Sequence, residues 1–221
     1  MRTPVISTVY VAVCLGLVIL LLSGCQTAYY EAMETLGYHK RDILTSRVQE
    51  ARDVQQEAKE QFQSALERFS AVLNFHGGEL EDKYDRLKTE LARSEEQAEA
   101  VRRRVDAVES VAEALFEEWE AELAQYTNDR LRRSSAQKLA QTRQRYTPLI
   151  QAMRRAEGKI EPVLTVFRDQ VLFLKHNLNA QAIASLHDEL VSVEADVGSL
   201  IRELEAAITQ ADAFIQAMGK T

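Results

Sequence analysis

Few side chains in this sequence of 221 residues combine the type and the spacing that site chemistry requires. The four histidines are His39, His76, His176 and His187, and none lies in a His-Glu-x-x-His pattern or a similar metal-ligand spacing. On one continuous helix His176 and His187 would share a face, but about 16 Å along the axis would separate them, too far for one metal ion. We therefore expect neither a metal site nor a cofactor.

Carboxylates and hydroxyls also give no clear catalytic pattern. Glu117 and Glu118 could supply general acid and base groups in a cleft, but in a helix rich in glutamate such pairs are typical of a solvated face. Ser134, Ser135 and Ser185 lack an adjacent glycine-rich nucleophile turn, and the sequence contains no glycine-rich phosphate loop. The formal net charge of −7 argues against nucleic-acid binding. We expect a protein that is not an enzyme and that binds neither nucleotides nor nucleic acids.

Cys25 is the one residue whose context predicts a specific reaction. Arg2 is followed by an apolar run over residues 5–22, and the sequence Leu-Ser-Gly-Cys ends at Cys25. This arrangement resembles a bacterial lipobox, in which the thiol receives diacylglycerol, the peptide is cut before the cysteine, and the new amino group receives a fatty acid such as palmitate. Several acyl chains would hold the protein firmly to a membrane. The alternative is a transmembrane helix, since a span needs about 20 apolar residues.

The residue after this cysteine indicates a location. In lipoproteins of Gram-negative bacteria an aspartate at this place usually keeps the protein on the inner membrane, so Gln26 resembles the signal for the outer membrane, facing the periplasm. We predict a signal peptide over residues 1–24 and a lipidated tether with a short helix over residues 25–39. Cys14 would leave with the signal peptide, so no thiol would remain for a disulfide, a metal or a nucleophile.

Long helices must position everything after the tether. Apolar residues recur every three or four positions over 44–72, 80–126 and 183–218, which is the pattern of helices that each present one seam to their neighbours. The pair Gly77-Gly78 can reverse the chain between the first two helices, because glycine adopts the backbone angles of a helix end and a tight turn. We predict an all-α fold, an elongated bundle of long antiparallel helices with coiled-coil-like packing.

The predicted bundle fills residues 40–221 in three parts. These are a long hairpin over about 40–127, kinked helices over about 128–178 and a C-terminal helix over about 180–218. Pro148 and Pro162 lie within the second part. Because proline lacks an N–H and disfavours helical geometry at the residue before it, we expect kinks or new helix starts at these two positions.

Residues 128–159 form a basic segment, with 9 Lys and Arg against 2 Asp and Glu. Its cations could pair with acidic helices of the same chain, such as the one that carries residues 113–122, where exposed pairs would stabilise the fold little. Alternatively they could bind an anionic envelope component such as lipid headgroups or lipopolysaccharide. The candidate anion-binding residues are Arg130, Arg132, Arg133, Lys138, Arg143 and Arg145.

Residues 170–187 carry a single formal charge and are apolar on more than one face around Leu172-Phe173-Leu174. The amides of Asn177 and Gln181 fall near the projected seam, where buried amides can set the register of packed helices. The alternative is a face that docks a partner. The candidate docking residues are Gln170, Lys175, His176, Asn177, Asn179 and Gln181.

Four stretches of the chain resemble one family. Residues 40–44, 77–81, 111–119 and 169–180 look like signature stretches of domain-of-unknown-function family 2959, and the likeness covers nearly all of the mature chain. The resemblance implies a helical, predicted bacterial lipoprotein without an established activity, and it supplies no catalytic residues.

Two roles follow from these patterns. We expect a non-enzymatic cell-envelope lipoprotein, held to the membrane by acylated Cys25, that acts as a structural or protein-interaction module by self-association or by docking an envelope protein. The alternative is a binder of an anionic envelope component through residues 128–159.

Overall fold

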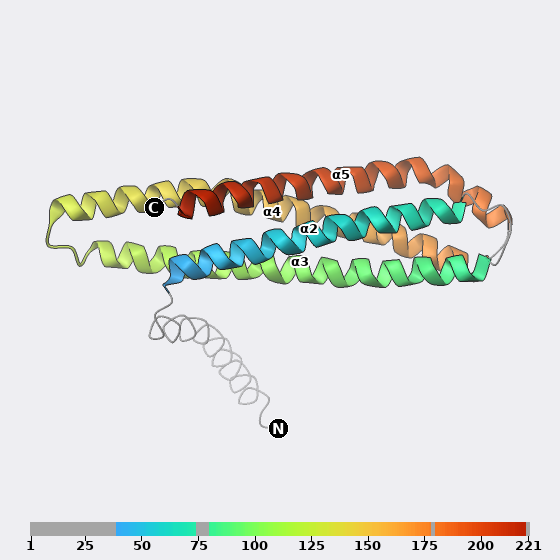
Figure 1. Ribbon diagram of the computed structural model, residues 1–221, viewed down its shortest axis with the longest axis horizontal. Coiled ribbons are helices and arrows are strands. Elements are labelled where there is room, and N and C mark those ends of the chain that lie inside the picture. Colours follow the sequence, from blue (N-terminus) through green and yellow to red (C-terminus); the bar gives the residue numbers. More distant parts are fainter. Residues whose placement is uncertain (1–38, 74–79, 178–179, 220–221) are drawn as a thin grey trace, which may run out of the picture. The chain divides into compact units, whose positions relative to one another are not determined.

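The computed structural model describes residues 39–73, 80–177 and 180–219 (Figure 1). The predicted signal peptide, Cys25 and nearly all of the tether lie outside the described residues, as do the Gly77-Gly78 turn and Asn179. The chain divides into two compact units, residues 1–43 and residues 44–221. The described part of the first unit enters helix α2, where the amides of Asp42 and Ile43 donate to the His39 carbonyl at 2.9 and 3.1 Å.

Four long helices make up the described structure. They are α2 (Lys40–Leu73), α3 (Leu80–Leu123), α4 (Asp129–His176) and α5 (Ala180–Gly219). Consecutive helices run antiparallel (Figure 1). At 1.5 Å per residue, the 48 residues of α4 span about 72 Å. The described ranges contain no strand, and the predicted all-α bundle of long helices is confirmed.

The seam of α2 follows the predicted spacing of three and four residues. Large apolar side chains such as Phe62 and Phe69 are fully buried, and each contributes about 1.5–3 kcal/mol to folding. Gln55 is the polar exception, because its side chain is 0 % exposed and neither amide atom has a hydrogen-bond partner among the described residues. All predicted seam positions are buried, namely Leu44, Val48, Ala51, Gln55, Ala58, Phe62, Ala65, Phe69 and Val72.

Helix α3 contacts α2 and α4. Its central seam residues Val101, Val105 and Val108 are fully buried. Toward its start, the Nε2 of Gln61 on α2 donates to the carboxylate of the buried Glu90 at 2.9 Å. The buried carboxylate of Glu90 is therefore paired across the α2–α3 interface, as buried charged groups require, unlike the amide of Gln55.

Helix α4 continues through both prolines, so of the two expected outcomes, a kink or a new helix start, the new start occurs at neither position. Pro148 and Pro162 lie on the exposed side of the helix. Each removes one donor, and the carbonyls four residues earlier belong to the exposed Gln144 and Gly158, where water can reach them. Because solvent satisfies the freed carbonyls, the prolines can be accommodated without ending the helix.

Helix α5 returns along α4 with the predicted seam on its inner side. Val197, Leu200, Leu204 and Ala207 are fully buried, and Phe214 is nearly so. In the described ranges, no helix carries an apolar stretch of the length that crossing a membrane needs.

Candidate functional site

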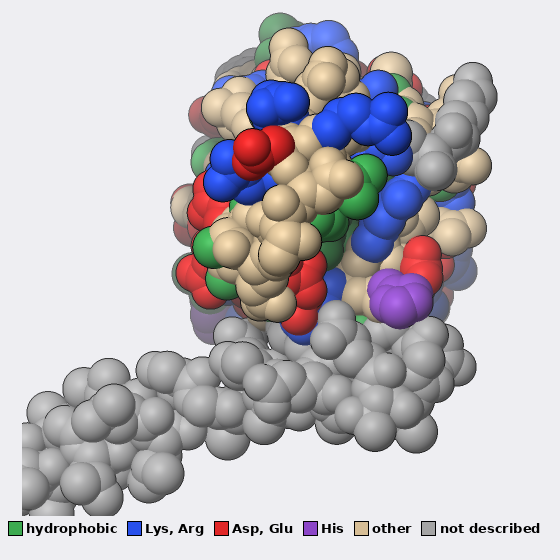
Figure 2. All heavy atoms as spheres, turned by 90° about the vertical axis from the view of Figure 1, so that its left-hand side faces the viewer, with side chains coloured by type: hydrophobic (Ala, Val, Ile, Leu, Met, Phe, Trp, Pro, Cys, Tyr) green, Lys and Arg blue, Asp and Glu red, His purple; other side chains and the backbone are tan. Residues whose placement is uncertain are grey.

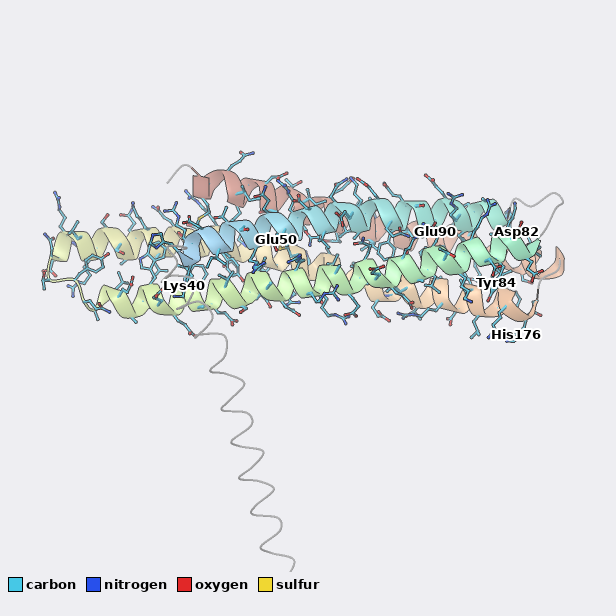
Figure 3. All side chains as sticks on the ribbon, turned by 60° about the horizontal axis from the view of Figure 1, so that its bottom comes forward. Lys40, Glu50, Asp82, Tyr84, Glu90 and His176 are labelled. Carbon is cyan, nitrogen blue, oxygen red and sulfur yellow. The ribbon has the colours of Figure 1, made fainter. Side chains whose placement is uncertain are left out.

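The predicted docking segment includes the first turns of α5 and the last turns of α4. Lys175 and His176 are exposed there, close in sequence to Leu172 and Phe173, whose exposed fractions of 59% and 39% are high for large apolar side chains. Figure 3 shows His176 at the same end of the bundle as Tyr84 of α3. This end of α4 therefore presents a mixed apolar and basic surface.

The two amide side chains of this segment that the structure describes are less exposed than those of Lys175 and His176. Gln170 is only 5% exposed and its Oε1 has no hydrogen-bond partner among the described residues, so it lies inside the bundle and not on the docking surface. Asn177 ends α4, and its Nδ2 donates to the carbonyl of Phe173 at 2.9 Å. Asn179 and the side chain of Gln181 lie outside the described residues. Asn177 is therefore a helix-end residue and does not set a buried register.

A groove of about 480 Å³ lies between the first half of α3 and the end of α4. Its apolar part includes Leu91, Ala92 and Leu172, and its polar part is mainly cationic. We name it the α3–α4 groove. Its lining residues are Tyr84, Lys88, Leu91, Ala92 and Glu95 of α3, and Arg168, Val171, Leu172 and Lys175 of α4.

The charges of the α3–α4 groove differ in how they are neutralised. Arg168 donates to Glu95 at 2.7 Å and to Glu161 at 2.5 Å, and these hydrogen bonds raise the pKa of its guanidinium above the usual value. Lys88 and Lys175 are exposed, and neither forms an ion pair with another described residue. One uncompensated positive charge therefore comes from each side of the groove.

Four of the nine Lys and Arg side chains of the basic segment 128–159 form ion pairs with carboxylates of described residues in the same chain, as the first of the two interpretations expects. Arg154 alone contacts three carboxylates of α3 and α4. The ion pairs are those of Arg132 with Asp129, Arg143 with Glu120, Arg154 with Asp106, Glu109 and Glu157, and Arg155 with Glu203.

The remaining candidate cations have no such partner. Arg130, Arg133 and Lys138 are exposed near the start of α4, Arg145 is exposed further along, and none forms an ion pair with another described residue. Leu131 lies among them and is 49% exposed. Figure 2 shows Lys and Arg side chains gathered on this end of the molecule. Three of these four unpaired cations therefore lie at the start of the segment, whereas Arg154 and Arg155 near its end are paired.

This end of the α3–α4 pair, residues 116–143, is named the tip. The last turns of α5 line a hollow with Gln144 and Pro148, so α5 ends beside this part of α4, and the turn between α3 and α4 lies beyond it (Figure 1). Tyr126 in that turn is 40% exposed. Asn128 caps α4 through its Oδ1, which accepts from the amides of Arg130 and Leu131 at 3.0 and 3.2 Å. The first basic side chains are thus fixed to a capped helix start.

Ring contacts join α3 to α4 at the base of the tip. The rings of Phe116 and Tyr146 meet edge to face with 5.4 Å between centroids, and Arg143 lies over the Phe116 ring at 5.1 Å. A hydrogen bond from Arg143 lowers the pKa of Glu120. Arg143 is therefore held by an aromatic ring and a carboxylate, which makes it a packing residue of this interface.

The sequence pattern did not single out the α3 side of the α3–α4 groove. Tyr84 and Leu91 occupy seam positions in the predicted stripe, yet both are only half-buried. The sequence feature that could have indicated this side of the groove is Lys88, a cation one helical turn after the apolar seam residue Tyr84. Within the described ranges, no group of three or more His, Cys, Asp or Glu side chains could hold a metal ion.

One of three comparisons with known proteins gives a match. A family model described as a protein of unknown function (DUF2959) matches residues 29–218, which confirms the resemblance that the sequence stretches indicated. No curated protein and no solved structure matches the chain.

Proposed function

Since the chain belongs to DUF2959, a family of proteins of unknown function, we propose that it works through its surface, as a non-enzymatic cell-envelope lipoprotein that serves as a structural or protein-interaction module. In this proposal acylated Cys25 holds the protein to the outer membrane, facing the periplasm. The support for the anchor is the Leu-Ser-Gly-Cys sequence that ends at Cys25 after an apolar run.

The observation that supports a docking role is the α3–α4 groove. Large apolar side chains are rarely left exposed together without a use, and here Leu172 and Phe173 are exposed beside a groove with an apolar floor. Lys88 and Lys175 flank that floor without a carboxylate partner among the described residues. The complementary partner is a protein segment with an apolar stripe and flanking carboxylates, such as an acidic amphipathic helix.

A second copy of this chain fits the groove less well. Two copies related by a two-fold axis on this face would bring like charges together, because the interface would be the same patch on both. A docked acidic segment would instead neutralise Lys88 and Lys175. The groove therefore favours a different protein as the partner.

Site-specific crosslinking in cells tests this role. A photo-reactive amino acid at Lys175 or His176 should capture a discrete protein whose contacting segment is acidic and amphipathic. The matched control is Val191 of α5, which is 75% exposed and apolar but outside the groove. Leu172→Glu should abolish the capture and Val191→Glu should not. Equal capture from both sites, or capture of this chain alone, would contradict the proposal.

The anchor has its own test. Mass spectrometry of the protein extracted from envelopes should show a chain that begins at Cys25 and carries acyl groups, whereas Cys25→Ser protein should keep residues 1–24 and carry none. A wild-type chain that keeps residues 1–24 without acyl groups would favour the transmembrane alternative over lipidation.

The second candidate function is binding of an anionic envelope component by the tip. The specific observation is that Arg130, Arg133 and Lys138 lack carboxylate partners among the described residues, while Leu131 and Tyr126 expose apolar area beside them. Cations beside exposed apolar side chains suit an anionic lipid surface.

Vesicle binding tests this second function. The combined variant R130Q, R133Q and K138Q should bind phosphatidylglycerol vesicles less strongly than the wild type, and the difference should shrink as salt is raised. The matched control removes three other exposed cations, Arg103, Lys88 and Lys175, by substitution with Gln. Equal losses in both variants would show that only net charge matters and would reject a role for the tip.

A further inference from the structure

A second hollow, between α2 and α3, gathers arginines that no predicted site includes. Its volume is about 390 Å³, within the usual range of about 300–1,000 Å³ for small-molecule sites. It opens to solvent beside the buried Glu90. The lining residues are Arg68 of α2 and Asp85, Arg86, Thr89, Glu90 and Arg93 of α3.

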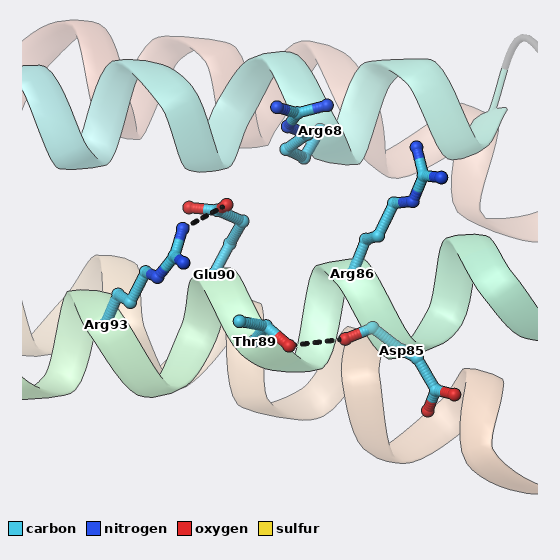
Figure 4. A pocket seen from close by; sticks show the side chains of 6 residues that line it. All are labelled: Arg68, Asp85, Arg86, Thr89, Glu90 and Arg93. Carbon is cyan, nitrogen blue, oxygen red and sulfur yellow. Dashed lines mark hydrogen bonds and ion pairs between the residues drawn. The ribbon is translucent and has the colours of Figure 1, made fainter.

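One of the three arginines is already neutralised. The Nη1 of Arg93 lies 3.2 Å from Oε1 of Glu90, whose other carboxylate oxygen accepts from Nε2 of Gln61 at 2.9 Å. Figure 4 shows this ion pair at one end of the hollow. Glu90 therefore has partners on both of its carboxylate oxygens, and the charge of Arg93 is neutralised within α3.

The other two arginines have no such carboxylate. Arg68 and Arg86 form no ion pair with a described residue. Both side chains line the hollow, and Figure 4 shows Arg86 extending from α3 toward α2 and Arg68 on the α2 side, whereas the Asp85 carboxylate points away from both. Thr89 donates its hydroxyl to the Asp85 backbone carbonyl at 2.8 Å, so this hydroxyl is used within α3. Two like charges from facing helices thus share one hollow.

We propose that this hollow is a binding site for a phosphate group, held between Arg68 and Arg86. Like charges that share a hollow repel each other, and an anion placed between them removes that repulsion. Guanidinium is a planar fork that matches two oxygens of a phosphate at once, and a phosphate has enough oxygens to accept from two forks. The site opens to solvent, so the phosphate can be free or can belong to a larger molecule such as a lipid headgroup. This proposal does not depend on the α3–α4 groove, on the tip or on the lipid anchor.

Calorimetric titration of the full-length chain in non-ionic detergent tests the proposal. The probes are inorganic phosphate, glycerol 3-phosphate as a headgroup, and succinate as a carboxylate control. Phosphate probes should bind, and R68Q with R86Q should weaken that binding about tenfold or more, because each variant position loses a charge-assisted pair. The matched control is R103Q with R202Q, which removes the same charge from exposed arginines outside every proposed site and should leave binding unchanged.

The outcomes separate the alternatives. Binding of both phosphate probes supports a site for the phosphate group itself, and binding of glycerol 3-phosphate alone supports a headgroup site. No binding of either probe, equally tight binding of succinate, or equal losses in the two double variants would overturn the proposal. If R68Q with R86Q loses its helical circular dichroism, R68K with R86K replaces it. This variant keeps the charge and removes the fork, and it should bind phosphate more weakly than the wild type, with unaltered binding counting against the site.

Discussion

The guanidinium of Arg154 on α4 donates two hydrogen bonds to the carboxylate of Glu109 on α3, one of them 3.1 Å from Nε to Oε1. The same side chain donates to Asp106 at 2.7 Å and to Glu157 at 2.5 Å. These hydrogen bonds, that of Glu109 first, raise the pKa of Arg154 further above its usual value. Arg154 is therefore the most connected cation of the basic segment, and its charge is used within the fold.

Arg154→Gln should lower the free energy of unfolding by about 1–2 kcal/mol, since it removes several charge-assisted hydrogen bonds at a partly exposed site. The next residue is the control. Arg155 has one ion pair, 3.5 Å to Glu203, and Arg155→Gln should change stability by less than about 0.5 kcal/mol. Urea unfolding followed by circular dichroism measures both. Equal effects would show that the Arg154 contacts add nothing beyond surface charge.

Gln55→Leu should stabilise the bundle by about 1–3 kcal/mol, because both amide atoms of the buried Gln55 lack partners among the described residues. An exposed position on α4 is the control, and Gln141→Leu should leave the urea midpoint nearly unchanged. Buried amides can also limit association, so sedimentation should accompany the unfolding measurement. A loss of stability in Gln55→Leu would mean that the amide has a partner such as bound water.

Trp119 is the single tryptophan and reports on the tip. Its Nε1 donates to Oγ of Ser135 at 2.8 Å, in the part of α3 and α4 that lies beyond α5. Because two helices bury less surface than four, the tip should open at lower urea than the rest of the bundle. Trp119 fluorescence should change before the circular dichroism does, and Ser135→Ala should widen the gap.

A second tryptophan supplies the control for the tip. In a chain with Trp119→Phe and Phe69→Trp, the probe sits in the buried seam of α2 and should follow the circular dichroism signal. If the original Trp119 also follows that signal, the tip and the bundle unfold as one unit.

Tyr146 should make the protein less stable at high pH. Burial first, and then the charges of Glu109 and Glu113, raise the pKa of its phenol above the usual value near 10. The folded state therefore binds this proton more tightly than the unfolded state does, and the resulting stability is present below pH 10 and lost as pH rises beyond it. Tyr146→Phe should reduce the fall in the urea midpoint between pH 9 and pH 11. An unchanged fall would exclude Tyr146 as its source.

Periodicity was enough to predict the helices and most of their seams. The α2 spacing from Leu44 to Val72 identified buried positions at every step, because each of them faces neighbouring helices. On α3 the same rule extended the seam to Tyr126, which is 40% exposed. A sequence stripe records which residues share a face of a helix, but the other helices decide how far that face is covered. Burial at the tip therefore could not be predicted.

The prolines and the arginine ion pairs also depend on surroundings that the sequence pattern does not determine. Proline chemistry predicts a lost donor at Pro148 and Pro162, but whether the helix restarts depends on whether water reaches the freed carbonyls. The basic composition of residues 128–159 left open whether its cations pair within the chain or bind an external anion. Only the packing of α3 against α4 separates Arg154, which has three carboxylates, from Arg133, which has none among the described residues.

The uninterrupted course of α4 through both prolines makes this helix a spacer of set length. Leu172 in the groove and Leu131 at the tip are 41 positions apart in one helix, or about 61 Å at 1.5 Å per residue. A protein held at one end and a lipid surface touched at the other would be kept apart by that distance. Removing one heptad from α3 and one from α4 together would shorten the reach by about 10 Å while preserving the seam.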